Sequence, residues 1–163
     1  MSAAVDQLIA RLDAVERRLV EHADAPLPSG LTEPDPGGEE RWEAGQVWAH
    51  VAEFPAFWLA QAQRVVSLPQ DEPVPFGRTK ADPGRVGAIE RDRHTDPHAL
   101  LARVRTALAD VTDTARSLPA EAWNRRGLHP ARGEMTVREI VERFLADHLE
   151  EHADQLDSLR TPG

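Results

Sequence analysis

Three histidines have positions suited to holding a metal ion. His148 and His152 are four residues apart, and both continue the apolar face of a predicted C-terminal helix. Side chains at this spacing lie one turn apart on the same face, so both imidazoles can reach one cation at about 2.0–2.1 Å. His50 lies on the apolar face of an earlier predicted helix. We therefore predict that His50, His148 and His152 converge on a metal site between two helices.

An alternative is that these histidines are ordinary core residues, because a lone His on an apolar face is more often hydrogen bonded than bound to metal. Three neutral imidazoles packed together need partners for their polar atoms, however, and one divalent cation satisfies all three. The other four histidines lie at predicted helix ends or in a loop and are weaker candidates. They are His22, His94, His98 and His129.

The elements that position these residues are predicted from apolar side chains recurring every three or four residues. Four segments have this period, and none shows sustained β alternation. The first predicted helix runs to about Ala23; the others run from near Trp42 to before Pro69, from Asp96-Pro97 to Leu118, and from Thr136 to about Arg160.

Local signals mark several boundaries. Asp96 before Pro97 is typical of an N-cap followed by proline at the first helical position. Thr136 and Glu139 form a predicted capping box. Pro55 should bend the second helix, because proline cannot donate to the carbonyl four residues earlier.

Long connections rich in proline and glycine separate the helices. We expect residues 25–41 to be irregular and residues 67–96 to form a long loop, a candidate lid over a site. The predicted fold class is all-α, a four-helix bundle with long connections that forms a single domain over residues 1–163. In such bundles, inward side chains from facing helices build the sites.

Composition limits the function classes. Nineteen basic and 28 acidic side chains give a net charge of −9, which disfavours nucleic acid and membrane partners. The absence of cysteine excludes disulfides, protein thiolate nucleophiles and Cys-ligated zinc. No apolar run reaches the roughly 20 residues needed to span a bilayer, and the N-terminus lacks a signal-peptide core. A cytoplasmic location is the resulting expectation.

The order of the motifs adds a further indication. His50 lies in WAHVAEFPAFW, His148 and His152 lie in FLADHLEEHADQL, and the stretch LPAEAWNRRGLHPARGEMTVREIV holds a Trp, a Gly-x-His-Pro and a Gly-x-x-Thr in sequence. In this order the chain resembles the DinB/YfiT-like superfamily of metal-binding four-helix proteins over nearly its whole length. The resemblance implies that the three histidines are the metal ligands.

The resemblance also implies an open site on zinc or nickel, where three protein ligands leave positions for water or substrate. Some relatives are S-transferases or isomerases that use low-molecular-weight thiols such as mycothiol, bacillithiol or glutathione. The mycothiol-dependent maleylpyruvate isomerases typically have Glu where this chain has His148, which argues against that particular activity. Relatives are often dimers, so a homodimer is expected.

Residues around the predicted ligands have candidate supporting roles. Ligating imidazoles commonly donate their other N–H to an oxygen. The carboxylates near the ligands in sequence are Glu53, Asp147 and Glu151. Arginines in the third connection, between the third and fourth predicted helices, are candidates to hold a carboxylate of a thiol or substrate. They are Arg125, Arg126 and Arg132.

The leading functional hypothesis is a divalent-metal-dependent transferase that activates a small thiol for attack on an electrophile. A metal-bound thiol loses its proton near neutral pH, which suits a chain without cysteine. Two alternatives stay open: a non-enzymatic metal-binding or stress-response protein with the same fold, and a purely structural bundle.

Overall fold

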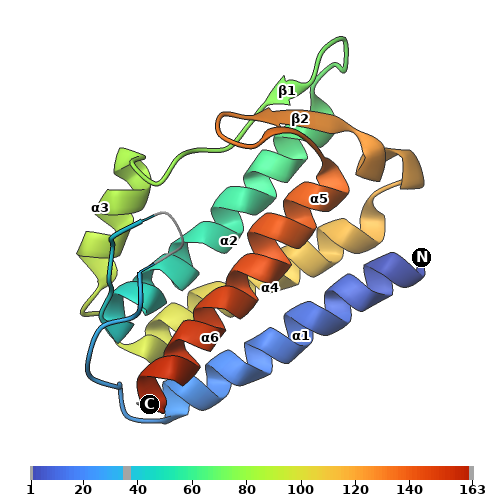
Figure 1. The fold of residues 1–163 in the computed structure, drawn as a ribbon. Helices are drawn as coiled ribbons and strands as arrows, with labels where there is room; N and C mark the ends of the chain where they lie inside the picture. The colour runs from blue at the N-terminus through green and yellow to red at the C-terminus, as the bar shows by residue number, and fades with distance from the viewer. Residues whose placement is uncertain (1, 35–37, 162–163) are drawn as a thin grey trace.

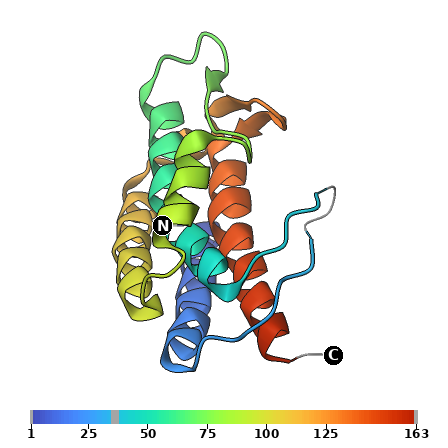
Figure 2. The same ribbon diagram turned by 90° about the vertical axis from the view of Figure 1, so that its left-hand side faces the viewer.

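The computed structural model describes residues 2–34 and 38–161, and four long helical stretches form its frame. They are α1 (Ala3–Asp24), α2 (Ala44–Ser67), α4 (Pro97–Ser117) and a C-terminal stretch made of α5 (Val137–Val141), a π-helical segment (Glu142–Asp147) and α6 (His148–Arg160). The four stretches lie side by side (Figures 1 and 2). The predicted all-α four-helix bundle is therefore confirmed.

Most of the buried apolar side chains lie between these helices and form the hydrophobic core. Trp48 and Phe54 of α2 are fully buried, as are leucines of α1, α4 and α6. Burying one such side chain stabilises a fold by about 1.5–3 kcal/mol, before the entropy of ordering the chain is subtracted. Among the described residues, no helix is long and apolar enough to cross a membrane.

The helix boundaries follow local chemistry. The Asp96 side chain accepts from the backbone of His98, and Thr136 with Glu139 forms the expected reciprocal capping box. The second helix begins at Ala44, two residues after the predicted Trp42, and continues through Pro55.

The long connections contain more structure than predicted. Residues 67–96, expected to be a loop, include β1 (Val74–Pro75) and the helix α3 (Pro83–Asp92), which packs on α2. Asp82 caps α3 ahead of Pro83, the same Asp-Pro signal that marks α4, but only Arg85, Ala88 and Ile89 of this short helix are buried, so its apolar period is weak. Of the connection 25–41, residues 35–37 lie outside the described residues.

The third connection also differs from expectation. After a short 3₁₀ turn (Ala120–Asn124), β2 (Arg126–His129) and β3 (Gly133–Thr136) form an antiparallel hairpin, and β1 pairs with β2 in parallel. This small sheet lies at one end of the bundle (Figure 1). Four-residue strands give too short an alternation to be seen in the sequence.

Candidate metal centre

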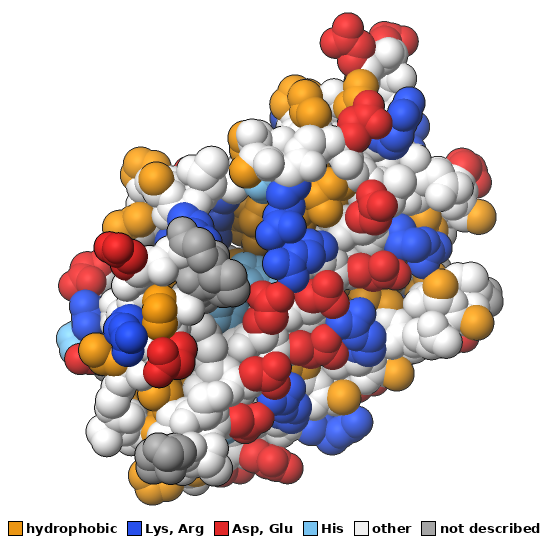
Figure 3. Space-filling view, viewed as in Figure 1, with side chains coloured by type: hydrophobic (Ala, Val, Ile, Leu, Met, Phe, Trp, Pro, Cys, Tyr) orange, Lys and Arg blue, Asp and Glu red, His pale blue; other side chains and the backbone are white. Residues whose placement is uncertain are grey.

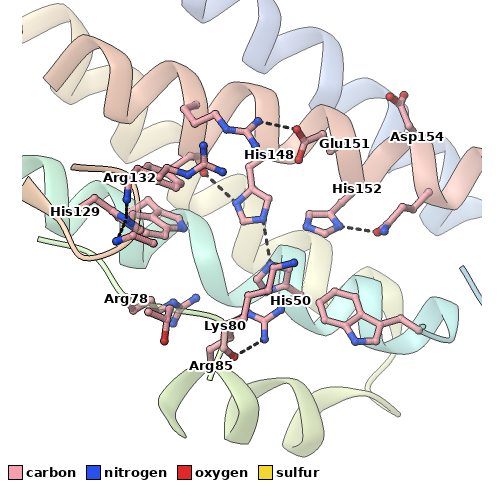
Figure 4. A pocket seen from close by; sticks show the side chains of 17 residues that line it. His50, Arg78, Lys80, Arg85, His129, Arg132, His148, Glu151, His152 and Asp154 are labelled. Carbon is pink, nitrogen blue, oxygen red and sulfur yellow. Dashed lines mark hydrogen bonds and ion pairs between the residues drawn. The ribbon is translucent and has the colours of Figure 1, made fainter. Parts of the chain in front are cut away.

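Two helices bring three imidazoles to one point, as expected. His50 comes from α2, and His148 and His152 come from one face of α6 (Figure 4). One nitrogen of each ring lies within 4.8 Å of the other two, and the Nε2 atoms of His50 and His148 are 3.2 Å apart. All three rings are at least partly buried.

An oxygen lies near the Nδ1 atom of each of the three rings. His148 Nδ1 lies 3.3 Å from the Phe144 carbonyl, and His152 Nδ1 lies 2.7 Å from Gln155 Oε1. Glu53 Oε2 is 3.1 Å from His50 Nδ1, a charge contact whose angle is not that of a hydrogen bond. These oxygens favour the proton on Nδ1, which leaves the Nε2 lone pairs available to a cation.

The local electrostatics keep two of the imidazoles, those of His50 and His148, in the neutral state. Burial, the other histidines and nearby arginines hold the pKa of His50 well below its ordinary value. Burial and His152 lower the pKa of His148 in the same way. Both rings are therefore neutral at pH 7, and neutral imidazole is the form that ligates.

Glu53 is the anchor on the α2 side of the centre. Arg78 donates two hydrogen bonds to its carboxylate, at 2.6 and 2.7 Å, and both side chains are only 9% exposed. Burial raises the pKa of Glu53, and the Arg78 guanidinium opposes that rise. This contact fixes the carboxylate beside His50 and ties the 76–82 segment to the centre.

An irregularity in the helix prepares His148. The backbone N–H of His148 donates to Leu145, at the end of the π-helical segment. The carbonyl of Phe144, which a regular α-helix would pair with that N–H, instead accepts from the His148 side chain. Single-turn π segments are frequent at functional sites, and here the Phe144 oxygen lies 3.3 Å from Nδ1 of His148.

The centre opens into a cavity of about 720 Å³. Trp42 stacks on His152, with ring centroids 5.9 Å apart, and Phe144 stacks on Trp58 at 4.0 Å, so aromatic rings form much of the wall. Figure 3 shows blue side chains around a hollow in which histidine and apolar side chains are visible. Described residues of the connections, including Arg78 and Arg132, complete the lining.

Of the three predicted supporting carboxylates, only Glu53 is seen close to a ring nitrogen of the three clustered histidines in the described part of the chain. Asp147 pairs with Arg11 on α1 at 2.6 Å. Glu151 lines the cavity, but it pairs with Arg143 at 2.7 Å. Residues on one helical turn point in different directions, so the nearness of Asp147 and Glu151 to the histidines in sequence does not bring both carboxylates to the histidine cluster.

The three predicted arginines also separate. Arg132 lines the cavity. Arg125 donates to the backbone carbonyls of Val65 and Leu68 and so joins the third connection to the end of α2. Arg126 pairs with Glu134 across the hairpin, away from the cavity.

The remaining histidines stand apart from the three. His22 is buried between Asp157 and Arg160, His98 pairs with Asp24 at the surface, and His94 is exposed. His129 is buried and lines the cavity, although it is not part of the cluster.

Sequence reasoning did not identify Trp42, Gln155, Arg78 and Arg85 as site residues. Gln155 carries a usable signal, because it follows His152 by three residues on the same helical face. Arg78 and Arg85 come from the connection between α2 and α4, whose path depends on long-range packing and leaves no periodic signal.

Several solved structures have a fold similar to that of this chain. The solved structure of YfiT from Bacillus subtilis, described as a probable metal-dependent hydrolase with an unusual four-helix bundle topology, is similar with a TM-score of 0.71 and 20% identity, over 98% of this chain and 87% of that one. A mycothiol-dependent maleylpyruvate isomerase is similar with a TM-score of 0.67 and 15% identity, over 96% of this chain and 63% of that one.

A third structure, an uncharacterized protein from Clostridium difficile 630, has a TM-score of 0.67 and 7% identity, over 98% of this chain and 97% of that one. At these identities the likeness establishes the fold. No curated protein sequence gives a match. The family model of the DinB superfamily matches residues 11–156, nearly the whole of the bundle, and the chain therefore belongs to the DinB superfamily.

Proposed function

We propose that this chain is a divalent-metal-dependent enzyme that transfers a low-molecular-weight thiol, such as mycothiol or bacillithiol, to a small electrophile. The ligands would be His50, His148 and His152, and the metal would be zinc or nickel. The observation that carries the proposal is the convergence of three imidazoles, each with an oxygen near its Nδ1 atom, at the edge of an open cavity.

The donor set suits such a metal. Three imidazoles from the protein are the ligand count of an open, catalytic zinc site, in contrast to the four of a closed structural site. When bound, the cation would supply a position where a thiol or a water molecule loses its proton near neutral pH. Because the chain contains no cysteine, the reacting sulfur must come from a cosubstrate.

The chain's own residues have defined parts in this proposal. Glu53, the Phe144 carbonyl and Gln155 orient the three rings through their Nδ1 atoms. Trp42 and Trp58 provide apolar walls that limit water in the cavity. Limiting water favours attack by sulfur on the electrophile over hydrolysis of the same compound.

Hydrolysis is the second candidate, favoured by the likeness to a protein described as a probable metal-dependent hydrolase. The same open centre would then activate water in place of a thiol. Membership of the superfamily is equally compatible with a metal-binding stress-response protein without turnover. A cytoplasmic location and a homodimer complete the proposal as expectations.

The test uses protein purified without a histidine tag. Its metal content is measured by elemental analysis, and turnover is measured with monochlorobimane as electrophile, with and without added thiol. Thiol-dependent conjugation that disappears in His152→Ala and persists in His98→Ala supports the transferase; His98 is a matched control because it is exposed and far from the cluster. Protein without stoichiometric metal would overturn the proposal, and metal with only thiol-independent hydrolysis would favour the second candidate.

A further inference from the structure

The cavity is basic although the chain is acidic. Five cationic side chains line it among the described residues, against two carboxylates, whereas the whole chain has 19 basic and 28 acidic residues. The cations are Arg78, Lys80, Arg85, Arg132 and Arg143, and the acids are Glu151 and Asp154. Such a reversal of charge at a concave site favours an anionic ligand.

Three of the arginines already have partners. Arg78 is held by Glu53 at 2.6 Å, and Arg143 by Glu151 at 2.7 Å. Arg85 is buried and donates to the backbone carbonyl of Lys80 at 2.8 Å. These three guanidiniums therefore have much of their hydrogen-bonding capacity occupied by the protein.

Arg132 differs from them. Within residues 2–34 and 38–161, no carboxylate pairs with its guanidinium, which lies over the face of Phe144 at 5.5 Å. Phe144 is one turn before His148 and provides the carbonyl that orients that ring. Arg132 therefore lies on the side of the cavity that adjoins the metal centre (Figure 4).

The backbone of Arg132 is held in place by His129. The turn between β2 and β3 folds back so that His129 Nδ1 accepts from the backbone N–H groups of Ala131 and Arg132, both at 3.1 Å. His129 itself is buried against Phe76 and Phe144. Gly77, at φ 90°, leaves room for the ring, since a Cβ there would lie 2.6 Å from His129 Cδ2.

We propose that Arg132 is a specificity-determining residue that binds a carboxylate group on the non-reacting part of the substrate, and that His129 is its positioning residue. This inference rests on the proposed function, because that proposal defines what the substrate is. A planar guanidinium matches a carboxylate with two parallel hydrogen bonds, and Arg132 has donors available for both. Its support on Phe144 places that carboxylate close to the His148 side of the centre.

The test measures binding of a simple dicarboxylate. Succinate is titrated into the tag-free protein and followed by tryptophan fluorescence, because Trp42 and Trp58 line the cavity. Arg132→Gln should weaken binding by about tenfold or more, the scale of a lost charge-assisted hydrogen bond. Arg126→Gln, a matched change in the same hairpin that lies outside the cavity, should not alter it, and uncharged succinamide should not bind.

His129 is tested with two variants in the same assay. His129→Leu removes the acceptor of the turn and should weaken succinate binding while the metal content stays unchanged. His129→Asn keeps an acceptor near the position of Nδ1 and should restore much of the affinity. If His129→Leu binds succinate as the wild type does, the positioning role is wrong.

Two results would overturn the role of Arg132. One is equal succinate affinity in wild type and Arg132→Gln, and the other is tighter binding of inorganic phosphate than of succinate, which would indicate a different anion class. Metal content is measured on the same samples. Loss of succinate binding in Arg132→Gln with no metal in any sample would retain this inference and reject the metal enzyme, so the two failures are distinguishable.

Discussion

Glu53→Gln tests how strongly the α2 side of the centre depends on one carboxylate. Gln has nearly the same volume, but it removes the negative charge that lies 3.1 Å from His50 Nδ1 and that accepts two hydrogen bonds from Arg78. Removing a residue that supports a metal ligand typically lowers metal affinity by about 10–100-fold. We expect a loss in this range, because His50 would keep its place but lose the negative charge beside its Nδ1 atom.

The same change should lower the stability of the metal-free protein. Arg78 is only 9% exposed, and its charge would be left without its carboxylate. One Gln oxygen can still accept from Arg78, so the cost should be near that of a lost charged hydrogen bond, about 1.5–3 kcal/mol, and below the roughly 3–5 kcal/mol of a fully broken buried pair.

The assays separate the two effects. Competition with a chromophoric chelator gives the metal dissociation constant, and urea unfolding of chelator-treated protein gives the free energy of unfolding. Glu151→Gln is the matched control, because Glu151 lines the cavity but contacts Arg143 and no ligand nitrogen. Wild-type metal affinity in Glu53→Gln, or an equal loss in Glu151→Gln, would refute the assigned role of Glu53.

Three further predictions concern the centre and its surroundings. His152→Ala should lose most of its bound metal, measured by elemental analysis, and should keep the helical signal in circular dichroism. The fold should survive because the apolar core does not include the cation. Unfolding on metal loss would instead show a structural site. Since the folded-state pKa values of His50 and His148 are lowered, the stability they contribute is present above about pH 6.5 and lost as pH falls. Urea midpoints of metal-free protein should therefore drop from pH 7 to pH 5, and a flat profile would contradict the neutral assignment. Gly77→Ala should destabilise by about 1–3 kcal/mol in thermal unfolding, because φ is 90° and the Cβ would meet His129.

The sequence was sufficient to predict the frame of the fold, because helix signals are local. The capping box at Thr136 and the Asp96-Pro97 cap act within four residues, and the apolar faces recur along each helix. The convergence of His50, His148 and His152 was predictable for the same reason. Each of them lies on the apolar face of its helix, and these faces pack toward one another in the core. The prediction needed no knowledge of how the connections run.

The connections could not be predicted because their structure depends on distant partners. β1 and β2 pair although about 50 residues separate them, and Arg125 finds its acceptors at the end of α2. The choice between Arg132 and Arg126 as a cavity residue is set by the turn that His129 closes. A hydrogen bond between a histidine ring and the backbone two and three residues later has no periodic signature.

The three histidines lie on helices, whereas Arg132 lies on a connection, and the two kinds of element differ in how readily they change. The residues next to His50 and His148 on their helices include fully buried side chains such as Val51 and Leu149. Moving either imidazole would therefore disturb the packed core, which is costly. Arg132, by contrast, is exposed on a turn, where a substitution leaves the bundle intact. If the proposed function holds, the metal chemistry is set by the rigid helices, whereas the part of the substrate that does not react is selected by the connections. Substituting Arg132 should then change which electrophiles or thiols are accepted without changing the metal content, whereas substituting one of the three histidines should remove both the metal and the activity.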